Sequence, residues 1–147
     1  ASTPELRALE AALRGDIEAL RQHPAAASAR DAWNATPLHL AAGAGHADVV
    51  EFLLSSSGDE AVAVLNRWDR TPLHEACARK GGRGRRAAVA LLVARRAPLE
   101  AADKDGRTAL QWAVTRGLKG VAEDLLAAGA SEAAKDRWGR GLLHLAA

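Results

Sequence analysis

Thr36-Pro37-Leu38-His39-Leu40-Ala41-Ala42 decides the fold of this chain, because the chain returns to it at nearly constant intervals. The copies begin at residues 36, 71, 108 and 141, which are 35, 37 and 33 residues apart. The later ones are Thr71-Pro72-Leu73-His74-Glu75-Ala76-Cys77, Thr108-Ala109-Leu110-Gln111-Trp112-Ala113-Val114 and the more divergent Gly141-Leu142-Leu143-His144-Leu145-Ala146-Ala147. This recurrence predicts structural units that stack in chain order, each contacting only its neighbours.

The repeated stretch has the features of a helix start. Thr36 suits the N-cap, and Pro37 follows at the first helical position, where its missing N–H costs nothing. A second apolar pattern, Val49-Val50 and Leu53-Leu54, follows Gly45 and predicts a second helix in each unit. The same reasoning predicts helices at about 4–14, 37–43, 47–55, 72–79, 86–94, 109–115 and 119–127.

The motif and its spacing resemble those of the ankyrin-repeat family. The resemblance implies an all-α repeat solenoid of helix-turn-helix pairs with projecting β-hairpin tips, at about 31–35, 67–70, 104–107 and 137–140. It also implies that His39, His74 and His144 bond the preceding Thr slot and nearby backbone, a structural role. We expect one domain over 1–147, with a degenerate capping repeat at 1–30, full repeats at 31–66, 67–103 and 104–136, and an incomplete repeat at 137–147.

Composition narrows the classes of function. No apolar run approaches the roughly 20 residues of a membrane span, and no carboxylate pair, Ser/His/Asp arrangement or Cys/His cluster has spacing suited to catalysis or metal binding. We therefore expect neither an enzyme nor a cofactor. The single cysteine, Cys77, cannot form an internal disulfide and fits a reducing, intracellular compartment.

The two ends suggest that the working molecule extends further. The sequence has no methionine, so Ala1 is not a translation start, and it stops at Ala147 inside the first helix of a repeat. Arrays of this kind usually finish with a polar capping repeat. We expect further chain or a partner to lie against the leucine-rich C-terminal end.

The candidate binding surface comprises the tips and the exposed side of each first helix, and we call it the concave face. The positions of this surface that point outward were counted from the first residue of each copy of the motif. Together they contain eight cations and one acid, Asp105. They also contain three tryptophans at one tip position. This surface should therefore be positive, although the whole chain has a net charge of only +2. The candidate partner-binding residues are Trp33, Arg67, Trp68, Arg70, Arg79, Lys104, Arg107, Arg116, Arg137, Trp138 and Arg140.

Two interpretations of these aromatic residues stay open. The tip tryptophans either pack flat on the adjoining hairpin or act with arginine as binding hot spots, for which both residue types are enriched. Trp112 lies within a first helix, at a position that predicts a structural core residue.

The chain is thus expected to be a non-catalytic protein-interaction module or scaffold subunit that binds a partner with acidic and apolar surface. The alternative is a nucleic acid or another polyanion, bound by the same face and by the basic 79–86 loop. Tips spaced by whole repeats suit a protein surface better than successive nucleotides.

Overall fold

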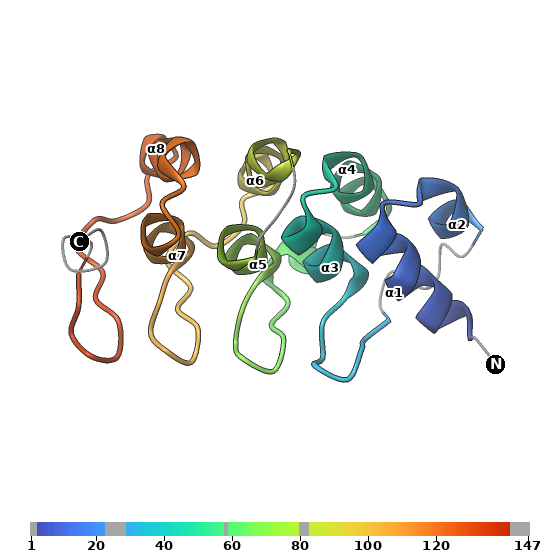
Figure 1. Cartoon of the computed structure of the whole chain (residues 1–147), viewed down its shortest axis with the longest axis horizontal. Helices are drawn as coiled ribbons and strands as arrows, with labels where there is room; N and C mark the ends of the chain where they lie inside the picture. The colour runs from blue at the N-terminus through green and yellow to red at the C-terminus, as the bar shows by residue number, and fades with distance from the viewer. Residues whose placement is uncertain (1–2, 23–28, 58, 80–82, 142–147) are drawn as a thin grey trace.

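The computed structural model describes residues 3–22, 29–57, 59–79 and 83–141. Its helices follow one another in pairs (Figure 1). They are α1 (Pro4–Arg14), α2 (Ile17–Arg21), α3 (Pro37–Ala44), α4 (Ala47–Ser56), α5 (Pro72–Ala78), α6 (Arg85–Ala94), α7 (Ala109–Thr115) and α8 (Lys119–Ala127), with the 3-10 helix η2 (Asp59–Ala63) between α4 and α5. The bounds of α1 and of α3 to α8 lie within one residue of the helices predicted from the sequence, whereas η2 was not predicted.

The recurring Thr residues start the first helix of each full repeat as predicted. The Thr36 hydroxyl accepts the N–H of His39, while Nδ1 of His39 accepts the N–H of Thr36 at 3.2 Å. The same reciprocal cap joins Thr71 to His74 and Thr108 to Gln111. Two orphan N–H groups at each helix start are thereby satisfied.

The capping side chains also join each repeat to the next. Nε2 of His39 lies 2.9 Å from the carbonyl oxygen of Arg70, and Nε2 of His74 lies 2.8 Å from that of Arg107. Gln111 donates to the carbonyl of Ala134 at 3.0 Å in the equivalent place. The structural role expected for His39 and His74 is confirmed, whereas His144 lies outside the described residues.

The helices form two layers (Figure 1). The layer next to the tips, which we call the inner layer, contains α1, α3, α5 and α7, and the outer layer contains α2, α4, α6 and α8. Pairs of elements in close contact belong to one repeat or to adjacent repeats. Leucine and valine fill the space between layers, and alanine lets the inner helices approach closely. Leu73, Leu92, Leu110 and Leu125 are fully buried, as are Ala41, Ala42, Ala76 and Ala113.

The predicted tips project from the inner layer as tight turns, and no strand occurs among the residues that the structure describes. Left-handed backbone at Asn34, Asp69, Gly106 and Gly139 closes the turns. One backbone hydrogen bond links each tip to the next: Arg67 donates to the carbonyl of Trp33, Lys104 to that of Trp68, and Arg137 to that of Asp105. The tips therefore form a continuous row. The expectation for the C-terminal end rests on residues 142–147, outside the described part of the chain.

Candidate functional site

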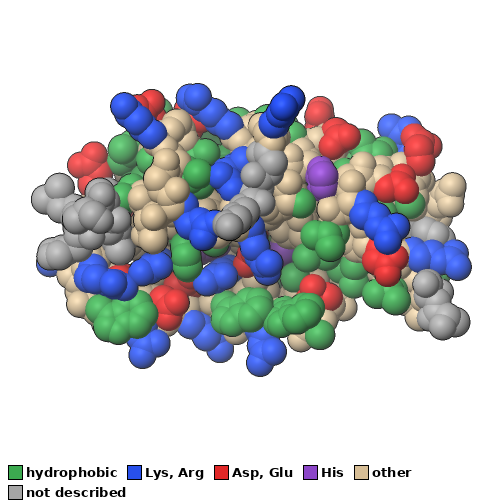
Figure 2. All heavy atoms as spheres, in the orientation of Figure 1, with side chains coloured by type: hydrophobic (Ala, Val, Ile, Leu, Met, Phe, Trp, Pro, Cys, Tyr) green, Lys and Arg blue, Asp and Glu red, His purple; other side chains and the backbone are tan. Residues whose placement is uncertain are grey.

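The predicted site residues gather along the row of tips and the adjoining side of the inner helices. Along this row, large hydrophobic side chains lie between Lys and Arg side chains (Figure 2). Trp33 and Trp138 are 50% and 56% exposed. Arg67, Arg79, Lys104, Arg116 and Arg137 are also exposed, whereas Trp68, Arg70, Arg107 and Arg140 are half-buried.

Three of the half-buried arginines take part in internal ion pairs. Arg70 lies 3.3 Å from Asp103 and 3.8 Å from Glu75. Arg140 lies 2.8 Å from Asp136, and Arg107 lies 3.8 Å from the same carboxylate. These cations hold the tips in place, so they are only partly available to a partner.

Two exposed arginines are paired as well. Arg79 donates to Glu75 at 2.8 Å, and Arg137 lies 3.7 Å from Asp105. The concave face is therefore less positive than its sequence positions indicated, because five of the eight predicted cations have an internal carboxylate partner. Ion-pair partners for Arg67, Lys104 and Arg116 are absent from the described residues.

The tryptophans and arginines stack on one another along the row. Arg67 and Arg70 each lie 5.8 Å from the Trp68 ring centroid. Arg137 and Arg140 lie 5.0 Å and 4.7 Å from that of Trp138. Such cation–π contacts fix both partners and leave a rigid, amphipathic surface.

Trp112 differs from its predicted position in the core. It is half-buried and packs against the core, but its indole N–H donates to Asp103 at 2.8 Å. The guanidinium groups of Arg70 and Arg107 lie 4.7 Å and 4.8 Å from its ring centroid. Trp112 therefore belongs to the stack on the concave face, because the register of neighbouring repeats brings two arginines over it.

The acids and amides that organise this face were not predicted from the sequence. One residue of this kind lies five positions before each Thr slot: Asp31, Asn66, Asp103 and Asp136. Its first side-chain oxygen accepts two backbone N–H groups of its own tip, as Asp136 does from Trp138 and Arg140. The recurrence of Asp or Asn at this position was the signal that could have identified them.

The second atom of three of these side chains binds a further partner, whereas that of Asp31 has none among the described residues. Asn66 donates its amide to Glu75 at 3.0 Å, whereas Asp103 accepts from Trp112 and Arg70. Burial alone would raise the pKa of Asp136, but hydrogen bonds from the Arg140 backbone and guanidinium hold this pKa below its ordinary value. The second, third and fourth tips are thus each fixed by a buried polar group with satisfied partners.

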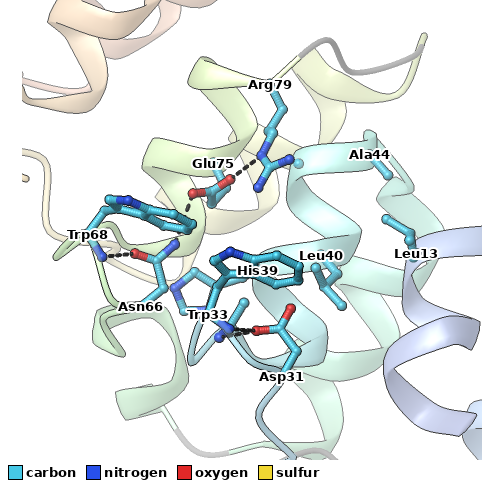
Figure 3. Close-up of a pocket in the computed structure, with 12 residues that line it drawn as sticks. Leu13, Asp31, Trp33, His39, Leu40, Ala44, Asn66, Trp68, Glu75 and Arg79 are labelled. Carbon is cyan, nitrogen blue, oxygen red and sulfur yellow. Dashed lines mark hydrogen bonds and ion pairs between the residues drawn. The ribbon is translucent and has the colours of Figure 1, made fainter. Parts of the chain in front are cut away.

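A cleft of about 350 Å³ opens between the first two tips (Figure 3). Trp33 and Trp68 contribute aromatic walls, Leu13 and Leu40 apolar surface, and Asp31 and Glu75 carboxylates. Glu75 is already bonded to Asn66 and Arg79. This cleft therefore combines aromatic and apolar surface with two carboxylates, one of which is already paired.

The basic loop adjoins a second, shallower cleft of about 250 Å³ at the starts of α6 and α8. Arg83, Arg85, Arg86 and Lys119 contribute to it. Arg86 makes two hydrogen bonds to Asp124, at 2.7 Å and 3.0 Å, and Arg85 donates to the carbonyl of Arg79. Much of the charge of this loop is thus engaged within the protein.

Other kinds of site find little support. Within the described ranges, no group of three His, Cys, Asp or Glu residues could hold a metal ion. None of the described helices is long and apolar enough to cross a membrane. Burial raises the pKa of the Cys77 thiol to about 12, which disfavours the reactive thiolate.

Stacked helix pairs that carry a row of tips define a helical-repeat protein with an extended surface for recognition. A family model for three copies of ankyrin repeats matches residues 8–97 and 66–136. The chain belongs to the ankyrin-repeat family, whose members generally bind protein partners and typically have no catalytic role.

Two curated relatives are the neurogenic locus notch homolog protein 1 of Xenopus laevis and that of Xenopus tropicalis. Each is 38% identical to this chain over 113 residues, which cover 76% of the chain. The match spans only 4% of the length of either relative. The similarity therefore concerns the repeat segment.

Proposed function

We propose that this chain is a protein-interaction module that binds its partner through the concave face. The partner presents acidic groups to Arg67, Lys104 and Arg116 and apolar surface to the exposed tryptophans. Two features of one face carry the proposal. These three cations are exposed and have no ion pair within the described residues, and Trp33 and Trp138 on the same face are half exposed. Arginine and tryptophan are the residue types most enriched at binding hot spots.

The rigidity of the tips supports the same proposal. Buried polar groups, backbone hydrogen bonds between tips and stacked arginines fix the face before a partner arrives. A pre-organised surface loses less conformational freedom on binding, and more of the contact energy appears as affinity.

Affinity capture with a charge-reversed variant tests the proposal. Arg67→Glu with Lys104→Glu changes two exposed tip cations and leaves Arg70 and Arg107 in their ion pairs. The matched control, Arg14→Glu with Arg96→Glu, makes the same change of charge at exposed positions at the end of α1 and after α6. We expect the first variant to lose partners that the unmodified chain and the control retain. Equal capture by both variants would contradict the proposal.

A salt titration with the captured partner separates a protein from a polyanion. Each phosphate contact that is neutralised adds nearly one unit to the slope of log K against log salt. We expect a shallow slope, since few cations of the face are unpaired. A slope of several units would instead favour the nucleic-acid alternative and the cleft beside Arg83 and Lys119.

A further inference from the structure

The first tip differs from the other tips in what surrounds its tryptophan. In the second tip, Arg67 and Arg70 lie over Trp68, and in the fourth, Arg137 and Arg140 lie over Trp138. The same positions beside Trp33 are Ala32 and Ala35. No guanidinium of the described residues lies over Trp33, and half of its surface is exposed.

The Asp31 carboxylate likewise lacks a partner that the equivalent carboxylates have. Its Oδ1 accepts the N–H groups of Trp33 and Ala35, both at 2.9 Å. Its second oxygen has no hydrogen bond or ion pair to any residue that the structure describes. In Figure 3 this oxygen points toward the Trp33 indole and Leu40.

The equivalent carboxylates show what is missing. Asp136 binds the guanidinium of Arg140, which also lies 4.7 Å from the Trp138 ring centroid. Asp103 binds Arg70 and the Trp112 indole. In the first repeat the positions of Arg140 and Trp112 are occupied by Ala35 and Leu40, whose side chains have no donor.

Two arginines near the cleft do not pair with the second oxygen of Asp31. Arg30, next to Asp31 in the chain, donates to the carbonyl of Asn34 at 3.3 Å. Arg79, on another side of the cleft, is paired with Glu75 at 2.8 Å. The cleft of about 350 Å³ can hold one long side chain, with Leu13 and Leu40 available to its apolar stem.

We propose that this cleft takes an arginine side chain of the partner protein, whose guanidinium pairs with Asp31 and stacks on Trp33; this inference rests on the proposed protein-binding function. The partner thereby supplies the arginine that the other tips carry themselves. A planar guanidinium can stack and donate to a carboxylate at once, which an ammonium group does less well. A purely apolar side chain would bury the free oxygen of Asp31 without a partner, at a cost in free energy.

An NMR titration of the isotope-labelled chain with N-acetyl-arginine amide tests the site directly. We expect saturable shifts at the Trp33 indole N–H and at the backbone amides of Asp31 and Ala35, with a dissociation constant of about 1 mM. The Trp138 indole should not respond, because its ring already carries two guanidinium groups. The lysine analogue should bind several-fold more weakly, and the leucine analogue should produce no saturable shift.

Two variants examine the role of each group. Asp31→Asn keeps the oxygen that accepts from the turn, as Asn66 does in the second tip, and should weaken arginine binding about tenfold. Ala35→Arg places an arginine at the position of Arg140 and should abolish binding by occupying the site from within.

The inference is overturned if the Trp33 signals do not saturate or if Trp138 responds equally. It is also overturned if the leucine or lysine analogue binds as tightly as the arginine analogue, or if the Ala35→Arg variant binds the arginine analogue normally. The titration involves neither a partner nor Arg67 and Lys104. Its failure would therefore reject the arginine site and leave the concave-face proposal standing, whereas normal capture by the Arg67/Lys104 variant would reject that broader proposal.

Discussion

Replacing Asp103 with alanine should destabilise the protein strongly, because one buried carboxylate serves two neighbouring repeats. Asp103 is 6% exposed. Its Oδ1 accepts the N–H groups of Asp105 and Arg107 at 2.9 and 3.0 Å. Its Oδ2 accepts from the Trp112 indole at 2.8 Å and from Arg70 at 3.3 Å.

The magnitude follows from these partners. A hydrogen bond to a charged group contributes about 1.5–3 kcal/mol, and a donor left buried without an acceptor costs about 1–3 kcal/mol. The backbone donors are half-buried and water can reach them in part, so the Trp112 and Arg70 donors dominate the loss. We expect Asp103→Ala to lower the free energy of unfolding by about 3–5 kcal/mol, a large share of the roughly 5–15 kcal/mol typical of a domain.

Asn66 at the second tip provides the matched comparison. Its oxygen accepts the N–H groups of Trp68 and Arg70, and its amide donates to Glu75. Asp103→Asn should keep the turn but place its amide against the Trp112 N–H, at a cost of about 1–2 kcal/mol. Adding Trp112→Glu recreates the Asn66–Glu75 pair at positions 103 and 112. The double variant should therefore lose less free energy of unfolding than the two single variants lose together.

Urea unfolding followed by circular dichroism measures Asp103→Ala and the four proteins of the 103/112 cycle under one condition, and the double-mutant cycle isolates the coupling between positions 103 and 112. We expect a coupling of about 1 kcal/mol or more. A loss below about 1 kcal/mol for Asp103→Ala, or strictly additive effects in the cycle, would refute the conclusion that this carboxylate joins the two repeats.

Three further outcomes are expected. Burial lowers the pKa of His39 and His74 below 6.5, so the unfolded chain binds more protons and stability should fall as pH drops from about 7 to about 5. Changing both to glutamine, as in the third repeat, should flatten this dependence in thermal unfolding. Gly84→Ala should cost about 1–3 kcal/mol in urea unfolding, because its Cβ would lie 2.0 Å from the carbonyl oxygen of Gly45; an unchanged midpoint would contradict this packing. Cys77 should react with a thiol reagent only on unfolding, because it is fully buried, and rapid reaction of the folded chain would show that the helix opens.

The repeats, the helices and their starts were determined by the sequence alone. Each depends on residues close together in the chain: a Thr and a His or Gln three positions apart, and apolar residues at helical spacing. Thr36 and His39 form the predicted cap in full, because both side chains belong to a single helical turn. Local features of this kind remain visible in the sequence because they do not depend on the placement of neighbouring repeats.

The charge and pairing of the concave face were decided by the tertiary structure. Arg70 was predicted to lie on this face, but its partners are Asp103, beside the third tip, and Trp112, in the third inner helix α7. The free oxygen of Asp31 likewise became evident only by comparison with the other tips. Whether a cation is paired or open depends on how adjacent repeats are rotated and offset, and a charge must lie within a few ångströms of its partner to form a pair. This register comes from the packing of many side chains together, and no local pattern records it.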